Sequence, residues 1–213
     1  TLCHRIVEEL YAVQDHWEPD AAAAKAEHLY EQLLPSMASE LLMEGRMVEN
    51  SRYQEAIVRA IYILVEAINK YGLTVEATEA PLKGEINGIP VIGYADLLLR
   101  DNGGQAFVLD MKWSTFAKYK RQEVEEGSAL QLATYAWMLR STDVAKDIHA
   151  GYFMLAQGQF ISDSSLLGNN AVISARTLEK TWDMAVASIN EVLNDLDQGL
   201  LKAHGIEELM QIN

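Results

Sequence analysis

Two glycine-containing turns constrain the fold of this chain more than any other feature. Asn87-Gly88 is the dipeptide that a two-residue hairpin turn of type I′ prefers, and Asn102-Gly103-Gly104 marks a second turn. They separate the stretches 73–82, 89–100 and 105–112, which are rich in the β-branched and apolar residues typical of strands. The pattern predicts an antiparallel meander of three strands.

Helical periodicity surrounds this meander, and a second pair of strands follows it. Upstream we expect helices over 2–13, from an Asp20 N-cap to about 37 with a bend or break at Pro35, and over 51–71, where Gly72 ends the helix. Downstream we expect a helix over 124–140, strands over 148–155 and 158–162, and a last helix over 175–196. This order predicts the α/β (α+β) class, with a mixed sheet flanked by helices.

Composition limits the classes of protein to which this chain can belong. Its 213 residues are enough for one core, and its single cysteine, Cys3, excludes a disulfide framework and is expected to be a small buried apolar residue. We find neither a signal peptide nor a membrane-length apolar run, and expect a cytoplasmic protein with no membrane partner. The net charge of −14 argues against strong autonomous DNA binding, because phosphate contacts need basic side chains.

Two carboxylates lie on strands that the second turn makes neighbours. Asp96 stands among apolar residues, where a carboxylate costs free energy unless it is paired or bound to metal. Asp110 ends the next strand, and alternation places Lys112 on the same side. Two carboxylates suit Mg²⁺, and a lysine beside them can orient water or stabilise charge on phosphorus. A solvated strand face for Asp96 and an ordinary salt bridge between Asp110 and Lys112 remain alternatives.

Gln131 and Tyr135 form a third feature, on the helix that follows. They stand four residues apart and therefore share one helix face. The alternative is a polar helix face with a core tyrosine. Upstream, Glu79 could approach the same site, although a surface glutamate is the commoner case.

Together these residues resemble the motifs of the RecB-type nucleases in the PD-(D/E)xK, or restriction-endonuclease-like, superfamily. That family carries Gly-x-x-Asp, Asp-x-Lys and Gln-x-x-x-Tyr in this order, which match Gly93 to Asp96, Asp110 to Lys112 and Gln131 to Tyr135. The segment Thr1 to Glu8 resembles the family's first helix, with a histidine at His4 and its leading glycine missing. We therefore expect further residues upstream of Thr1.

The resemblance implies roles for these side chains. His4, Asp96, Asp110 and the Met111 carbonyl would bind Mg²⁺, for which Mn²⁺ may substitute. Lys112 would act as catalytic base or charge stabiliser. Gln131 and Tyr135 would position Lys112 or the DNA strand. The iron–sulfur cluster of some relatives needs four cysteines, so none is expected here.

The resemblance also implies the organisation and activity of the chain. We expect one nuclease domain over 1–213, with a core of 1–17 and 72–196 and a helical insertion over about 20–71. Its expected activity is Mg²⁺-dependent DNA hydrolysis, exonuclease rather than endonuclease, as part of a helicase–nuclease or another DNA repair or recombination system. The alternative is a catalytically silent DNA-binding or scaffold module.

A basic cluster follows the Asp-x-Lys motif. Lys118, Lys120 and Arg121 are expected in a loop, where they could contact two or three phosphates. The alternative is a solvated loop without a ligand. A cluster this small predicts only modest affinity of the isolated domain for DNA.

Overall fold

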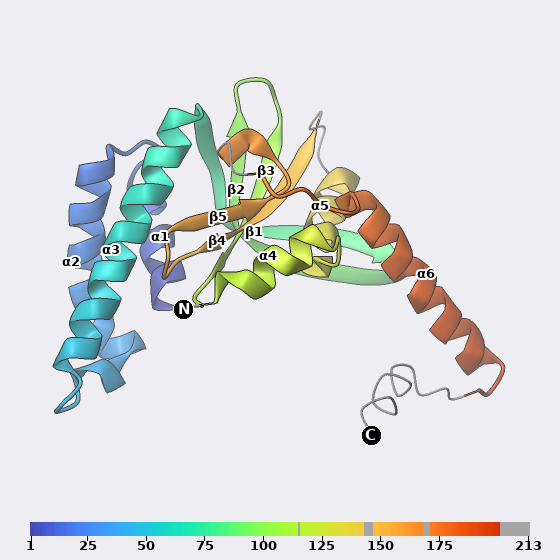
Figure 1. The fold of residues 1–213 in the computed structure, drawn as a ribbon, viewed down its shortest axis with the longest axis horizontal. Helices are drawn as coiled ribbons and strands as arrows, with labels where there is room; N and C mark the ends of the chain where they lie inside the picture. Colours follow the sequence, from blue (N-terminus) through green and yellow to red (C-terminus); the bar gives the residue numbers. More distant parts are fainter. Residues whose placement is uncertain (115, 143–146, 168–170, 201–213) are drawn as a thin grey trace.

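In the computed structural model, a five-stranded sheet forms the centre of the chain (Figure 1). The structure describes residues 1–114, 116–142, 147–167 and 171–200. The strands lie in chain order across the sheet: β1 (Leu73–Ile86), β2 (Ile89–Asp101), β3 (Ala106–Lys112), β4 (Ile148–Met154) and β5 (Gln159–Ser162). The three-strand meander predicted from the two turns is therefore confirmed.

The turn between β1 and β2 has the expected geometry. Asn87 and Gly88 have φ values of 53° and 80°, the left-handed pair that a type I′ hairpin requires. The first strand runs further toward this turn than the sequence predicted, because β1 continues to Ile86, whereas β2 begins at Ile89 as expected. The result is a long two-stranded ribbon.

The central strand β3 explains why the sheet is mixed. It pairs antiparallel with β2 and parallel with β4. A parallel pair needs a crossover connection, and α4 (Ala117–Glu125) and α5 (Leu130–Thr142) supply it. Residues 106–111 of β3 are all buried, since helices cover both faces of the sheet at this point.

Three helices pack on one face of the sheet: α1 (Leu2–Val13), α2 (Pro19–Met37) and α3 (Met47–Lys70) (Figure 1). The Asp20 N-cap was wrong: α2 has Pro19 in its first turn and Glu18 at the N-cap. The expected break at Pro35 does not occur, because the helix continues to Met37. Val13, the last residue of α1, is exposed.

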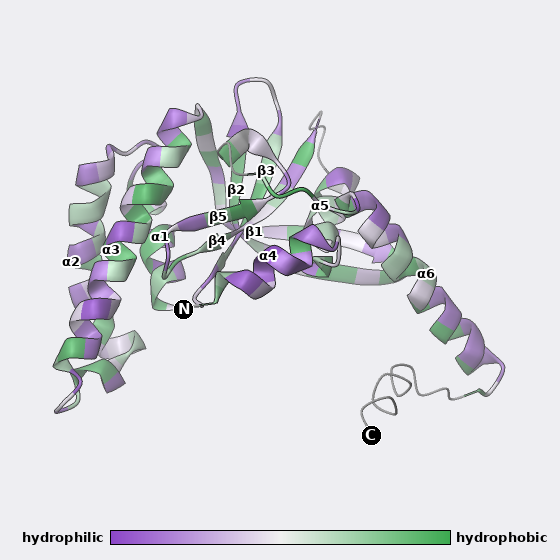
Figure 2. Cartoon of the chain, viewed as in Figure 1, coloured by the Kyte–Doolittle hydropathy of each residue, from purple (hydrophilic) through white to green (hydrophobic). Residues whose placement is uncertain are grey.

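The opposite face is covered by α4 and α5, and α6 (Leu178–Asp197) packs against α5 and extends away from the sheet. The single helix expected over 124–140 is two helices. Gly127, with φ of 63°, lies just past the end of α4, and its amide donates to the Val124 carbonyl. The chain then starts α5 in a new direction. Figure 2 shows the central strands as largely hydrophobic and α4 as mainly hydrophilic.

Cys3 lies in the core on α1, as expected for a small buried residue. Burial raises the pKa of its thiol to about 12. Within the described part of the chain, no helix is long and apolar enough to cross a membrane. The limits of the helical insertion, about 20–71, stay a prediction.

Candidate active site at a strand fork

The site begins where β2 separates from β3. Their ladder ends at the pair Leu97–Leu109, and Asp96 is the next residue of β2. Its Oδ2 atom accepts a hydrogen bond from the Met111 amide at 2.5 Å, so a side chain takes the place of the next ladder bond. This contact holds the Asp96 carboxylate in the gap between the two diverging strands.

Helix α1 reaches the fork from one face of the sheet. The Thr1 side chain caps the helix at the His4 amide and also contacts His4 Nδ1. The other ring nitrogen, Nε2, lies 3.2 Å from Asp96 Oδ2. The N-terminal turn of α1 thus places the His4 imidazole in contact with the Asp96 carboxylate.

Asp110 and Lys112 project from β3 toward the other face. Asp110 is only 2% exposed, and its Oδ2 atom lies 2.7 Å from Lys112 Nζ. Burial raises the pKa of the Asp110 carboxyl, the nearby Lys112 ammonium partly offsets this effect, and Asp96 raises the pKa further. The predicted alternation, which puts Asp110 and Lys112 on one side of β3, is present.

Helix α5 completes this side of the site. Gln131 Nε2 donates to Asp110 Oδ1 at 2.7 Å and to Tyr135 Oη at 2.9 Å. The four-residue spacing therefore produces a chain of contacts from Tyr135 through Gln131 to the buried carboxylate. Burial is the main reason that the pKa of the Tyr135 phenol is raised.

The close approach of α5 to the β1–β2 ribbon depends on two glycines. A Cβ atom at Gly93 would lie 2.8 Å from Met138 Cε and 3.3 Å from Tyr135 Cε1. At Gly84 it would lie 2.4 Å from two ring atoms of Trp137. The missing side chain of Gly93 thus makes room for the tyrosine that contacts Gln131.

This geometry predicts different effects for Gly93→Ala and Gly84→Ala. The rigid Trp137 ring cannot yield easily, so Gly84→Ala should cost about 1–3 kcal/mol of stability. Met138 can move aside for Gly93→Ala, but Tyr135 must shift, and cleavage by the folded protein should fall roughly 10-fold, or about 1.4 kcal/mol in barrier. Urea unfolding and cleavage rates separate the two effects. If Gly93→Ala and Gly84→Ala lost the same amount of cleavage activity for the same loss of unfolding free energy, the special role of Gly93 would be contradicted.

The family model of the PD-(D/E)XK nuclease superfamily matches residues 1–208. The chain belongs to this superfamily. This membership confirms the expected fold class and identifies the protein as a member of a nuclease family. The search among curated proteins found no significant match. Among solved structures, the chain is similar to one from Eubacterium rectale named "Putative exonuclease", with 13% identity, a TM-score of 0.38, and coverage of 86% of this chain and 76% of that one.

Members of this nuclease superfamily generally use divalent metal ions. The side chains at the fork are of the chemical types that bind such an ion. One imidazole and two carboxylates suit Mg²⁺ or Mn²⁺. Asp110 Oδ2 is buried and receives no aligned hydrogen bond from any described residue, although Lys112 Nζ is near. Across the described ranges, however, no three His, Cys, Asp or Glu side chains converge as a ready ligand set. A bound ion would compete with Lys112 and His4 for the carboxylate oxygens.

Glu79 lies closer to the site of the nuclease than the sequence suggested. It has φ of 46°, a left-handed conformation that is uncommon outside glycine, and the strand register places it opposite Asp96. Burial raises its pKa most, and Asp96 and Glu8 raise it further. Glu8 was visible only as part of the resemblance to the first helix, and the strand irregularity has no signal in the sequence.

A second network beside Asp110 escaped the sequence reasoning. Tyr152 is the register partner of Asp110 on β4, and it is fully buried. Its hydroxyl donates to Glu123 at 3.0 Å, and Lys120 Nζ lies 4.8 Å from its ring centroid. A tyrosine in the otherwise apolar strand 151–154 was the available signal, since a buried hydroxyl needs a partner. The network fixes α4 beside β4, the strand that pairs with β3 at Asp110.

The basic cluster differs from its prediction. Lys118, Lys120 and Arg121 lie on α4 and not in a loop. Lys120 pairs with Glu123 at 2.6 Å, and Arg121 lies 3.4 Å from Glu125. Lys118 is exposed and forms no ion pair with another described residue. The positive field for phosphates is therefore weaker than the sequence suggested.

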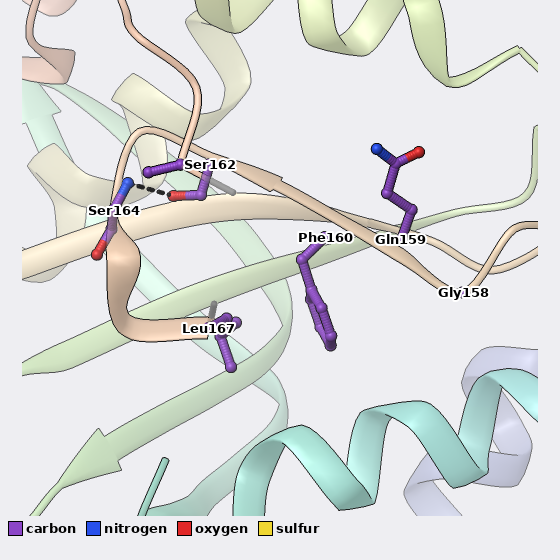
Figure 3. A pocket seen from close by; sticks show the side chains of 7 residues that line it. Gly158, Gln159, Phe160, Ser162, Ser164 and Leu167 are labelled. Carbon is purple, nitrogen blue, oxygen red and sulfur yellow. Dashed lines mark hydrogen bonds between the residues drawn. The ribbon is translucent and has the colours of Figure 1, made fainter. Parts of the chain in front are cut away.

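The hollow drawn in Figure 3 lies elsewhere, along the edge strand β5. It contains none of the residues at the fork. Its polar groups include Ser162 Oγ, which donates to the Ala150 carbonyl and accepts from the Ser164 amide. No titratable side chain is among the residues that line it. We assign it no part in the chemistry.

Proposed function

We propose that this nuclease hydrolyses DNA phosphodiester bonds at the strand fork, with Mg²⁺ or Mn²⁺ bound by His4, Asp96, Asp110 and the Met111 carbonyl. The observation that carries the proposal is the buried Asp110 carboxylate, with Lys112 Nζ 2.7 Å from one oxygen and Gln131 Nε2 2.7 Å from the other. A carboxylate is buried in this way when it has a ligand or a charge partner to hold.

A divalent ion held by these residues would supply Lewis acidity and make water a better nucleophile at neutral pH. The protein side chains and amides position the two carboxylates and balance the negative charge at the site. The Met111 amide fixes Asp96, and Gln131 fixes Asp110, so both carboxylates are preorganised. Lys112, partly exposed beside Asp110, is placed to orient the attacking water or to stabilise negative charge on the phosphate. Tyr135 holds Gln131 in position.

The finer assignment is also a proposal. The order and spacing of Gly93-x-x-Asp96, Asp110-x-Lys112 and Gln131-x-x-x-Tyr135 favour the RecB type, which supports an exonuclease that works with a helicase or another DNA-processing partner. The net charge of −14 supports such a partner, because the chain alone offers an unfavourable field to DNA. A role in cytoplasmic DNA repair or recombination follows from the same resemblance.

Cleavage assays test this function directly. Labelled single- and double-stranded DNA should be degraded in Mg²⁺ or Mn²⁺ and should stay intact in EDTA. Ladder and end-label patterns distinguish release from an end from internal cuts. DNA binding without cleavage in any divalent metal would favour the silent-module alternative.

A further inference from the structure

The last helix, α6, carries a single apolar stripe along nearly its whole length. Its members recur every three or four residues, so they share one side of the helix. They are Leu178, Trp182, Ala185, Ile189, Val192 and Leu196. The first part of the stripe packs against α5, where the buried ring of Trp182 stacks on Trp137 with the ring centroids 4.2 Å apart. A stripe of this kind normally packs against another element along its whole length.

The second half of α6 leaves the body of the protein. In the β1–β2 turn, Asn87 Nδ2 donates to Asn190 Oδ1 at 2.6 Å, which ties the middle of the helix to the turn. Beyond Asn190 the helix continues to Asp197 and extends away from the sheet (Figure 1). The stripe therefore continues past the last contact of this kind that anchors the helix.

The apolar side chains on this second half are open to solvent. Ile189, Val192 and Leu196 are 39%, 37% and 48% exposed. In the part of the chain that the structure describes, none of the three belongs to either hydrophobic core. Regular helix geometry places them on one surface, because they lie three and four residues apart. A continuous exposed apolar stripe of this kind indicates a surface on which another helix docks.

The charge of the same half-helix determines which kind of partner fits. From Ile189 to Asp197 it carries Glu191, Asp195 and Asp197 and no lysine or arginine. Glu191 and Asp197 are exposed. A second copy of this helix would bring like charges together, and DNA or an anionic lipid surface would also be repelled. A helix that carries basic side chains beside its own apolar face is attracted instead.

We propose that the second half of α6, from Ile189 to Leu196, is the docking surface for an amphipathic helix of a partner protein, with basic side chains flanking the apolar face of that helix. The partner helix packs along the stripe, and its basic side chains lie near Glu191 and Asp197. Binding of such a helix offsets part of the negative charge that the chain presents to DNA. No side chain of α6 belongs to the fork, so the docking goes beyond the proposed function and does not depend on it.

Two synthetic peptides test both the apolar and the charged part of the surface. Each has about 21 residues, or three heptads, with Ile and Leu at the a and d positions. One carries Lys at the e and g positions and the other carries Glu. In fluorescence anisotropy with the full chain, the Lys peptide should bind at least about 10-fold more tightly than the Glu peptide. The difference should shrink as salt is added.

Alanine variants locate the binding on the helix. Ile189→Ala, Val192→Ala and Leu196→Ala, combined in one protein, should weaken binding of the Lys peptide at least about 10-fold. Alanine is the best helix former, so the helix itself is retained. Met184→Ala is the matched control, because Met184 is exposed on another side of the same helix, and it should leave binding unchanged. Hydrogen exchange should slow on binding at the amides of the second half of α6.

Three results would overturn the proposal. Equal binding of the Lys and Glu peptides, or binding of neither, would exclude a basic partner helix. A dimer in sedimentation that the triple alanine variant abolishes would assign the stripe to a second copy of this chain. A fall in melting temperature as large as that of Trp182→Ala would show that the chain itself covers the stripe. The triple variant should cleave DNA at the wild-type rate, so failure of the docking is distinct from failure of the nuclease function.

Discussion

Lys112→Ala should lower the rate of DNA cleavage at least about 100-fold while the protein stays folded. Preorganised groups that meet charge developing in the transition state each contribute about 10²–10³ in rate. The Lys112 side chain is one-third exposed at its position on β3, so its removal leaves no buried cavity. The buried Asp110 keeps its hydrogen bond from Gln131. Single-turnover cleavage and thermal unfolding, measured on the same preparation, give the two quantities.

The matched control is Lys180→Ala, because Lys180 is exposed on α6 and contributes no side chain to the fork. It should cleave at the wild-type rate. A Lys112→Arg variant tests whether charge alone suffices, since a guanidinium keeps the charge but changes its shape. Near wild-type turnover by Lys112→Ala would exclude this lysine from the mechanism.

The sequence predicted which side chains form the site better than it predicted how the elements bring them together. Two turns fixed the meander, and the two-residue period placed Asp110 and Lys112 on one side of β3, where the structure has them 2.7 Å apart. The four-residue spacing of Gln131 and Tyr135 likewise predicted their shared helix face, and they are in contact. Each of these predictions depends on local periodicity, which a single sequence displays.

The remaining geometry depends on tertiary contacts that have no local period. The fork opens because Asp96 accepts the Met111 amide, and nothing in the strand pattern marks that exchange. It allows α1 from one face and α5 from the other to reach adjacent carboxylates. Glu79, which lies opposite Asp96 on β1, has a left-handed conformation that no local pattern marks either. The end of α4 just before Gly127 could have been predicted from this glycine, but residues typical of helices continue on both sides of it.

Asp110→Asn should abolish cleavage and, in the absence of metal, raise the melting temperature at neutral pH. In the proposed mechanism Asp110 binds the metal, so its loss should remove several kcal/mol of transition-state stabilisation, roughly 1,000-fold or more in rate. Asparagine has nearly the same shape and can still accept the hydrogen bond from Gln131. It also removes the charge whose burial raises the pKa of Asp110.

The sign of the stability change follows from proton linkage. Because the pKa of Asp110 is higher in the folded state than its ordinary value of 3.8, the folded protein binds this proton more tightly than the unfolded chain. The stability associated with the neutral carboxyl is present at low pH and is lost as the pH rises through the raised pKa. The advantage of Asp110→Asn should therefore grow over this range and reach a plateau above it. Below pH 3.8, where the carboxyl is neutral in both states, it should disappear.

Added metal should reverse the order of the melting temperatures, so that the wild type melts above Asp110→Asn. A ligand that binds only the folded state stabilises it in proportion to the logarithm of its concentration above Kd, so millimolar Mg²⁺ or Mn²⁺ should raise the melting temperature of the wild type. Asp110→Asn should show little of this shift. The exposed carboxylate Asp20 provides the control, because Asp20→Asn on α2 should retain the full metal response. If Asp110→Asn and the wild type gain equally from Mn²⁺, the ion is not bound at this fork, and the buried carboxylate must then be held for its contact with Lys112 alone.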